Sequence, residues 1–208
     1  KFNYEQAAYG MKLMAWGFFK KLVVADVLSP YVQRVYSAPG YFSGFPLVIA
    51  TFFFSIQIYC DFSGYSDIAI GSAKLMGIDL ITNFKSPYFS QSIREHWSRW
   101  HISLTTWFKD YLYIPLGGIN GVGQIIESIV VPKDRFKSKG VVRWLRFLFI
   151  YIFMLFSQIF FVSSSIKDAF YVISHLFSGI SSPGTYITSG INAMGLTPVM
   201  MIIIAVSI

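Results

Sequence analysis

Two long stretches without any charged residue limit what this chain can fold into. From residue 35 to residue 60 no side chain is charged, and the second half of that stretch reads FPLVIATFFFSIQIYC. This comes close to the roughly 20 apolar residues that a helix needs to cross a bilayer. A second uncharged stretch, residues 147–166, has arginines just before it and a lysine just after it, as spanning helices often do. Residues 45–60 and 147–166 are therefore predicted to span a membrane.

The composition agrees with lipid as the solvent of much of the chain. Hydrophobic residues make up 54% of the 208 residues and charged residues 13%, whereas soluble domains carry about 25% charged residues. The alternative is a soluble protein with a very aromatic core. The net charge of +7 does not indicate a nucleic-acid partner, because the basic residues are scattered between apolar runs. That pattern is typical of cytoplasmic loops beside anionic membrane lipid.

Residues 11–32 are apolar but are interrupted by Lys20, Lys21 and Asp26. An interfacial or re-entrant helix suits them at least as well as a full span. Residues 66–78 are predicted as a helix that is too short to cross alone and that follows a turn at residues 63–65. Residues 196–208 are apolar to the last residue, and we predict that the chain stops inside a third span. The expected fold class is an all-α, multi-pass integral membrane protein.

The most informative stretch is residues 92–111, which read SIREHWSRWHISLTTWFKDY. At about 100° per residue, one helix over this stretch separates an aromatic side from a polar side. The aromatic side contains Trp97, Trp100, Leu104, Trp107 and Tyr111, and the polar side contains Arg94, Ser98, His101, Thr105 and Lys109. Such a helix would lie with its aromatic side against protein or membrane interface and show His101 to a polar interior.

His101 is the strongest histidine candidate, because ionisable groups at membrane depth are costly and usually functional. The alternative is an interfacial helix whose tryptophans anchor it and whose charges are solvated. His96 lies nearer the aromatic side, so we interpret it as a packing residue. His175 has no carboxylate within a helical turn or two on its C-terminal side, and we interpret it as structural.

A second polar group follows the first predicted span, where YCDFSGYSDIAIG contains Asp61, Tyr65 and Asp67. Helix capping and turn formation explain Asp67 and its neighbouring serines. Asp61 comes directly after uncharged residues, and a buried carboxylate normally pairs with a cation. Arg94 and Arg99 are its predicted partners.

The sequence carries no signature of a metal or nucleotide site. It has one cysteine, Cys60, and its histidines lack partners at the spacing of zinc ligands. We therefore expect no metal and no bound cofactor. Cys60 is interpreted as a small buried apolar residue.

Two blocks of the sequence resemble a known family. They read YCDFSGYSDIAIGSAKLMGIDLITNF and SPYFSQSIREHWSRWHISLTTWFKDYLYIPLGG, and over residues 2–118 the chain is similar to membrane-bound O-acyltransferases of the alginate O-acetyltransferase branch. The resemblance implies a partial ring of membrane helices, with interfacial and re-entrant helices, around a tunnel. Through it an acyl group would pass from a cytoplasmic thioester donor to an acceptor outside. His101 matches the first of two hallmark histidines, and the expected tunnel or structural polar residues are Asp61, Tyr65, Asp67, Arg94, Arg99 and Thr105.

The second hallmark of the family has no counterpart in this sequence. It is a Leu-Trp-His-Gly block whose histidine is the usual catalytic base. Gly118 runs directly into residues 119–127, which resemble the stretch that normally follows that helix, and Val162 stands where relatives commonly have an arginine. We therefore expect an internal deletion near Gly118, truncation at both ends, and two segments of one membrane domain, 1–118 and 119–208.

The resemblance implies a bacterial plasma-membrane enzyme that acetylates an exported or cell-surface polysaccharide. Acetyl-CoA or a similar acyl thioester would be the co-substrate, and a separate extracytoplasmic acetyltransferase would be the partner protein. Because the catalytic histidine is missing, we expect the activity of this chain to be impaired or absent. A catalytically dead scaffold or binding fragment is the first alternative, and a transporter or channel lined by Asp61 and His101 is the second.

Overall fold

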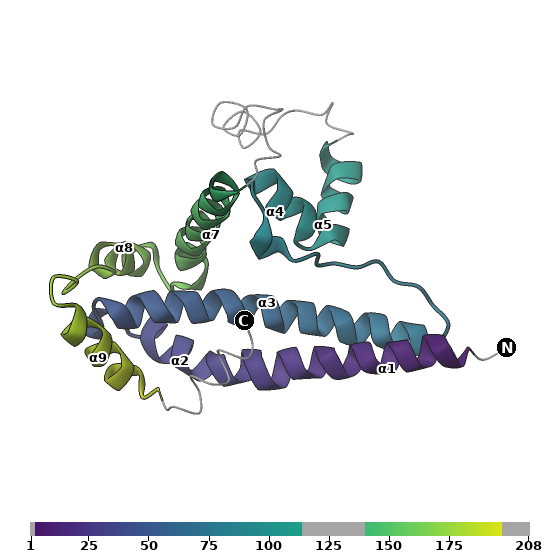
Figure 1. Cartoon of the computed structure of the whole chain (residues 1–208), viewed down its shortest axis with the longest axis horizontal. Helices are drawn as coiled ribbons and strands as arrows, with labels where there is room; N and C mark the ends of the chain where they lie inside the picture. The colour runs from purple at the N-terminus through teal and green to yellow at the C-terminus, as the bar shows by residue number, and fades with distance from the viewer. Residues whose placement is uncertain (1–2, 114–139, 197–208) are drawn as a thin grey trace. The chain divides into compact units, whose positions relative to one another are not determined.

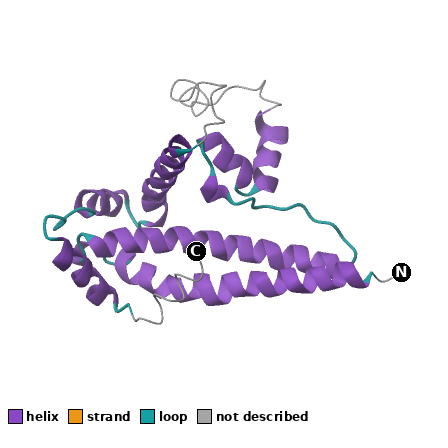
Figure 2. Ribbon diagram, viewed as in Figure 1, coloured by secondary structure: helices purple, strands orange, loops and turns teal. Residues whose placement is uncertain are grey.

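The computed structural model describes residues 3–113 and 140–196, and every regular element in these residues is helical (Figure 2). The helices in chain order are α1 (Tyr4–Phe18), the π-helix η1 (Phe19–Ala25), α2 (Asp26–Tyr36), α3 (Phe45–Leu75), α4 (Ile93–Arg99), α5 (Ile102–Trp107), the π-helix η4 (Phe108–Tyr113), α7 (Val141–Val162), α8 (Ile166–His175) and α9 (Pro183–Met194). Two 3-10 turns, η2 (Pro39–Tyr41) and η3 (Pro87–Phe89), lie between them. The predicted all-α fold class is confirmed for this part of the chain.

The chain divides into two compact units. The first unit comprises Lys1–Ile78 and Leu155–Ile208, and the second unit comprises Asp79–Met154. The boundary falls inside α7. The residues around His101 therefore belong to the second unit, and the residues around Asp61 belong to the first.

Within the described residues two helices, α3 and α7, are long and apolar enough to cross a membrane. They have 31 and 22 residues, and their most apolar windows have mean hydropathies of 1.6 and 2.1. Only 17% of the α7 window is buried, so most of its apolar surface lies open, as expected of a surface that contacts lipid. These helices contain the two predicted spans, although α7 ends at Val162 rather than at residue 166. The third predicted span, residues 196–208, lies outside the described residues except for its first residue.

The helix α3 continues unbroken through residues 63–65. The predicted turn at this place, and the separate short helix after it, are therefore wrong. The small residues that indicated a turn serve helix packing instead, because Ser63 and Gly64 are both buried. Asp67 consequently lies in the interior of a long helix and does not cap one.

The helices α1 and α3 lie side by side and run antiparallel (Figure 1). Two glycine pairs allow their backbones to approach closely, Gly10 with Gly71 and Gly17 with Gly64. A Cβ on Gly17 would lie 2.6 Å from the carbonyl oxygen of Gly64, and a Cβ on Gly71 would lie 2.5 Å from that of Gly10. Contact of this kind is typical of small residues at helix interfaces in membranes.

Residues 11–32 belong to a helical run from Tyr4 to Tyr36 that comprises α1, η1 and α2. The run continues through Lys20 and Lys21, and α3 supplies a carboxylate partner for each of these lysines. The Lys20 ammonium lies 2.6 Å from the Asp67 carboxylate. This pairing removes much of the cost that an isolated lysine would bring to an apolar environment.

The hydrophobic core of the first unit is built from η1, α2, α3, the C-terminal end of α7, α8 and α9. Its most deeply buried side chains include Val35, Leu47, Phe53, Ile159, Val172 and Met194. A buried hydrogen bond joins the Tyr36 hydroxyl to Thr51 Oγ1 at 2.6 Å. Cys60 is buried in the same core as a free thiol, which confirms its interpretation as a small apolar residue.

Candidate functional site

The stretch around His101 is not one helix. The helix α4 ends at Arg99, Trp100 is extended, and α5 begins at Ile102. Between the two helices His101 adopts the left-handed conformation, with φ 44° and ψ 57°. A residue with a side chain pays a steric cost there, and this conformation stops the helical hydrogen-bond pattern. The single helix predicted over residues 92–111 is therefore wrong.

Thr105 connects the two short helices across this break. Its hydroxyl lies 3.2 Å from the Trp97 carbonyl oxygen and 3.3 Å from that of Trp100. These carbonyls come at the end of α4, where the helix leaves its last acceptors without partners. Thr105 thus satisfies backbone acceptors from within α5, and the structure gives this predicted polar residue a bracing contact.

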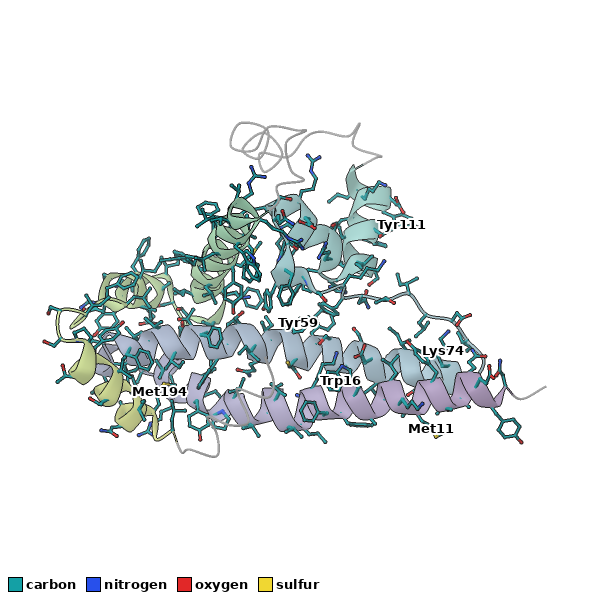
Figure 3. The ribbon with its side chains drawn as sticks, viewed as in Figure 1. Met11, Trp16, Tyr59, Lys74, Tyr111 and Met194 are labelled. Carbon is teal, nitrogen blue, oxygen red and sulfur yellow. The ribbon has the colours of Figure 1, made fainter. Side chains whose placement is uncertain are left out.

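The predicted aromatic side is divided by the same break. Trp100 packs inward, with its ring centroid 5.8 Å from that of His96 and 5.1 Å from that of Phe84. Trp97 and Trp107 are each 52% exposed. In η4 the exposed ring of Tyr111, labelled in Figure 3, stacks on Trp107 at 5.6 Å. Trp100 therefore belongs to a packed cluster, whereas Trp97 before His101 and Trp107 after it remain exposed.

His101 itself is partly buried at the turn. Burial lowers the pKa of its imidazole below the usual value of 6.5, because removing water penalises the charged ring. The ring is accordingly neutral at pH 7, and a neutral imidazole can accept a proton. This protonation state is the one that a general base requires.

The segment before α4 braces the turn from outside. The Asn83 carbonyl oxygen accepts from the Ile102 N–H, and its side-chain Oδ1 accepts from the Ser103 N–H, both at 3.0 Å. The Lys85 N–H donates to the Arg99 carbonyl oxygen, also at 3.0 Å. Sequence reasoning missed Asn83, because an asparagine in an irregular segment gives no local signal of a partner twenty residues away.

His96 is a packing residue in the structure. It is buried, and its Nδ1 lies 3.1 Å from the Pro87 carbonyl oxygen, to which it donates. Burial lowers the pKa of His96, and the hydrogen bond to Pro87 opposes that shift in part. These contacts are those expected from its predicted packing role.

We expect the second unit to lose stability as the pH falls below the ordinary histidine pKa of about 6.5. The lowered pKa of His96 means that the unfolded chain binds more protons than the folded one in this range. The stabilisation is complete above the unfolded value and is lost as the pH falls toward the folded value. Denaturant unfolding in detergent, followed by tryptophan fluorescence above and below that pH, measures the loss.

The matched control for this prediction is His96→Phe, which keeps an aromatic ring against Trp100 and cannot titrate. His101 also has a lowered pKa and adds a loss of the same sign, so His101→Gln is measured beside it. A pH-dependent loss that is undiminished in His96→Phe would contradict the assignment to His96.

Within its own unit Asp61 has a lysine as its partner, and its pairing with Arg94 or Arg99 of the other unit stays a prediction. Asp61 pairs with Lys21, whose ammonium lies 2.6 Å from its carboxylate and 3.0 Å from that of Asp26. The other lysine of the same π-helix, Lys20, is held by Asp67 at 2.6 Å and by the Ser63 hydroxyl at 3.0 Å. The sequence offered a signal for both pairs, because two adjacent lysines interrupt an otherwise apolar segment.

The arginines that were expected near Asp61 lie in the second unit. Arg99 forms an ion pair with Glu95 one helical turn away, at 2.6 Å. Arg94 is exposed on α4, and Tyr65 is 68% exposed on α3. Of the predicted polar residues, the first unit therefore holds Asp61, Tyr65 and Asp67, and the second holds Arg94, Arg99, His101 and Thr105.

The side chain of His175 makes local contacts of the kind expected of a structural residue, and its carbonyl oxygen accepts from the Gly44 N–H at 2.8 Å. Its ring stacks on Tyr171 with centroids 4.1 Å apart, and Nδ1 lies 2.9 Å from the Tyr171 carbonyl oxygen. Across residues 3–113 and 140–196, no three histidine, cysteine or acidic side chains are grouped so as to hold a metal ion.

The comparison with known proteins decides the family. The model of the membrane-bound O-acyltransferase family matches residues 3–129, which is more than half of the chain. The chain belongs to the membrane-bound O-acyltransferase family. The match includes α3 with its two aspartates and the strained turn at His101.

Several relatives of this chain are named for O-acetylation of alginate or of peptidoglycan. The chain is 44% identical over 117 residues to a probable alginate O-acetylase of Azotobacter vinelandii, covering 56% of this chain and 23% of the relative. It is 48% identical over 105 residues to the probable alginate O-acetylase of Pseudomonas syringae pv. tomato, covering 50% and 20%. With the peptidoglycan O-acetyltransferase of Helicobacter pylori it shares 40% over 124 residues, covering 60% and 23%. The chain thus spans about a fifth to a quarter of the length of the curated relatives it matches.

Proposed function

We propose that this chain is a segment of a bacterial membrane O-acetyltransferase that acts on an exported or cell-surface polysaccharide. The support is the family match together with relatives that are named for O-acetylation of alginate and of peptidoglycan. Both names describe transfer of an acyl group to a hydroxyl of a glycan. The acyl donor in this proposal is a cytoplasmic thioester, acetyl-CoA or a similar one, used as a co-substrate.

The main structural support for this proposal is the strained turn at His101. The residue that matches a family hallmark is also a residue with a side chain in the left-handed conformation, and strain of this kind gathers at functional sites. Its lowered pKa keeps the ring neutral at pH 7. We assign to His101 a place on the acyl-transfer path, and to Thr105 and Arg99 the support of the helices beside it.

We place this enzyme in the plasma membrane, with membrane lipid and a second protein as its partners. Helices α3 and α7 supply two spans of a multi-pass protein in the plasma membrane, and the family's helical ring would be completed by segments beyond those described. The acceptor polysaccharide would be presented by a separate extracytoplasmic acetyltransferase. Membrane lipid is the remaining partner.

We further propose that this chain alone is impaired. The Trp-His-Gly block is absent from the sequence, and the place where it is expected, after Gly118, lies outside the described residues. A scaffold or binding role is the second candidate, favoured by that absence. The transporter alternative has less support, because Asp61 is held by Lys21 rather than left to line a channel.

A chimaeric enzyme tests the proposed function. The 117 matched residues of this chain replace their counterpart in the Azotobacter vinelandii relative, in cells that lack their own copy, and the acetyl content of alginate is measured. We expect the chimaera to acetylate alginate, and we expect His101→Gln in it to lower the rate by about 10² or more, the range of positioned acid–base catalysis.

The matched control is Ser98→Ala, which changes an exposed side chain on the preceding helix. It should leave acetylation close to that of the parent chimaera. Full acetylation by the His101→Gln chimaera would remove His101 from the transfer path. A correctly inserted chimaera that acetylates nothing would reject the functional equivalence of this segment.

A further inference from the structure

The conformation of His101 needs support from elsewhere in the chain. The residue has left-handed backbone angles without being glycine, and its own side chain does not cap the following helix. A free chain would relax such a residue to a more common conformation. Relaxation would rotate the Cα–Cβ bond and turn the imidazole in a new direction.

The support comes from a short segment that ends at Lys85. Asn83 accepts the first two amide protons after the strained residue, from Ile102 through its carbonyl oxygen and from Ser103 through Oδ1. On the other side of His101, the Lys85 N–H donates to the Arg99 carbonyl oxygen at 3.0 Å. The segment therefore holds the backbone on both sides of the histidine.

The side chain of Asn83 has a special part in this arrangement. The hydrogen bonds from Ile102 to Asn83 and from Lys85 to Arg99 use backbone atoms. The hydrogen bond from Ser103 instead requires a side-chain oxygen on residue 83 within hydrogen-bonding distance. An amide N–H at the start of a helix needs such an acceptor, and here it is supplied from a residue distant in sequence.

We propose that Asn83 is a positioning residue that fixes the direction of the His101 imidazole through its hydrogen bond to Ser103. Its role in acyl transfer rests on the proposed function of His101, but its effect on the histidine does not. Phe84 packs on Trp100 with ring centroids 5.1 Å apart, a contact that does not use the Asn83 side chain. We therefore expect the unit to keep its fold in an Asn83 variant while the turn loses one of its restraints.

The test uses histidine NMR of the full chain in nanodiscs. The chain has three histidines, and single His→Gln variants assign their ring signals. In Asn83→Ala we expect the His101 signals to shift or split into several conformers, while those of His96 and His175 stay in place. Asn83→Asp keeps the acceptor oxygen and should retain a single set of His101 signals.

The matched control is Asn3→Ala. Asn3 makes the same type of bond, from Oδ1 to the Gln6 N–H at 3.1 Å, at the start of α1. It should leave His101 unchanged. Unaltered His101 signals in Asn83→Ala would overturn the proposal, and so would equal changes at His101 and His96, which indicate general loosening of the unit.

A second readout separates this inference from the proposed function. In the alginate chimaera, Asn83→Ala should lower kcat by up to about 10²-fold with little change in KM, as misplacement of a reacting group does. If His101→Gln proves harmless there while the NMR result holds, the catalytic role of His101 fails and the positioning role of Asn83 stands. If the NMR result fails, the positioning role is wrong whatever the activity.

Discussion

A version of this chain with a Trp-His-Gly helix inserted after Gly118 should transfer acetyl groups to a hydroxyl acceptor about 10² to 10⁴ times faster than the chain itself. That factor is the usual contribution of a positioned general base, and the inserted histidine would restore it. We do not expect His101 to replace that base, since it matches the other hallmark of the family. Further loss would come from poorer positioning of donor and acceptor without the inserted helix.

The measurement is single-turnover transfer from an acetyl thioester in proteoliposomes that also contain the polysaccharide partner machinery. A control insertion with glutamine in place of the histidine has the same length and apolar character. It separates the effect of the missing base on the transfer rate from the effect of the missing helix. Equal rates for the chain and for the version with the Trp-His-Gly insertion would show that the chemistry lies on other residues.

Lys20→Met should destabilise the first unit by about 3–5 kcal/mol, the usual cost of removing one partner from a buried ion pair. The Lys20 and Asp67 side chains are only 11% and 20% exposed. Without the ammonium, Asp67 would remain as an uncompensated charge inside a long apolar helix. Equilibrium unfolding in mixed micelles with increasing denaturing detergent gives the change in free energy.

Two further variants make this prediction specific. Lys20→Met combined with Asp67→Leu should recover most of the loss, because an apolar pair of similar volume can replace a buried ion pair. Lys21→Met is the matched control, since Lys21 and Asp61 are 40% and 50% exposed, and exposed pairs contribute about 0–1 kcal/mol. A double variant as unstable as Lys20→Met alone would show that the two side chains are not coupled.

The amino-acid sequence by itself determined the fold class and the family. Apolar runs of spanning length depend on composition and length alone, so α3 and α7 could be located before any tertiary contact was known. The first of them was placed at its correct starting residue, Phe45. His101 was identified because the block around it is a sequence pattern, which requires no knowledge of its neighbours in space.

Local sequence patterns led to the errors in helix boundaries. Periodicity relates each residue to those three and four positions away, so it extended one helix over residues 92–111, whereas the small residues at 63–65 indicated a turn. The break at His101 depends on Asn83 and on Thr105, and the continuity of α3 depends on close glycine contact with α1. Neither contact belongs to the local pattern.

Only the tertiary structure decided which charges meet. In the sequence, Lys20 and Lys21 precede the two aspartates, and Arg94 and Arg99 follow them. Charge alone does not decide whether the lysines or the arginines are the partners. The antiparallel packing of α1 and η1 against α3 places the lysines beside the aspartates. Pairing is set by the register of the two helices, which follows from the glycine contacts between them, and it is this long-range geometry that a single sequence does not show.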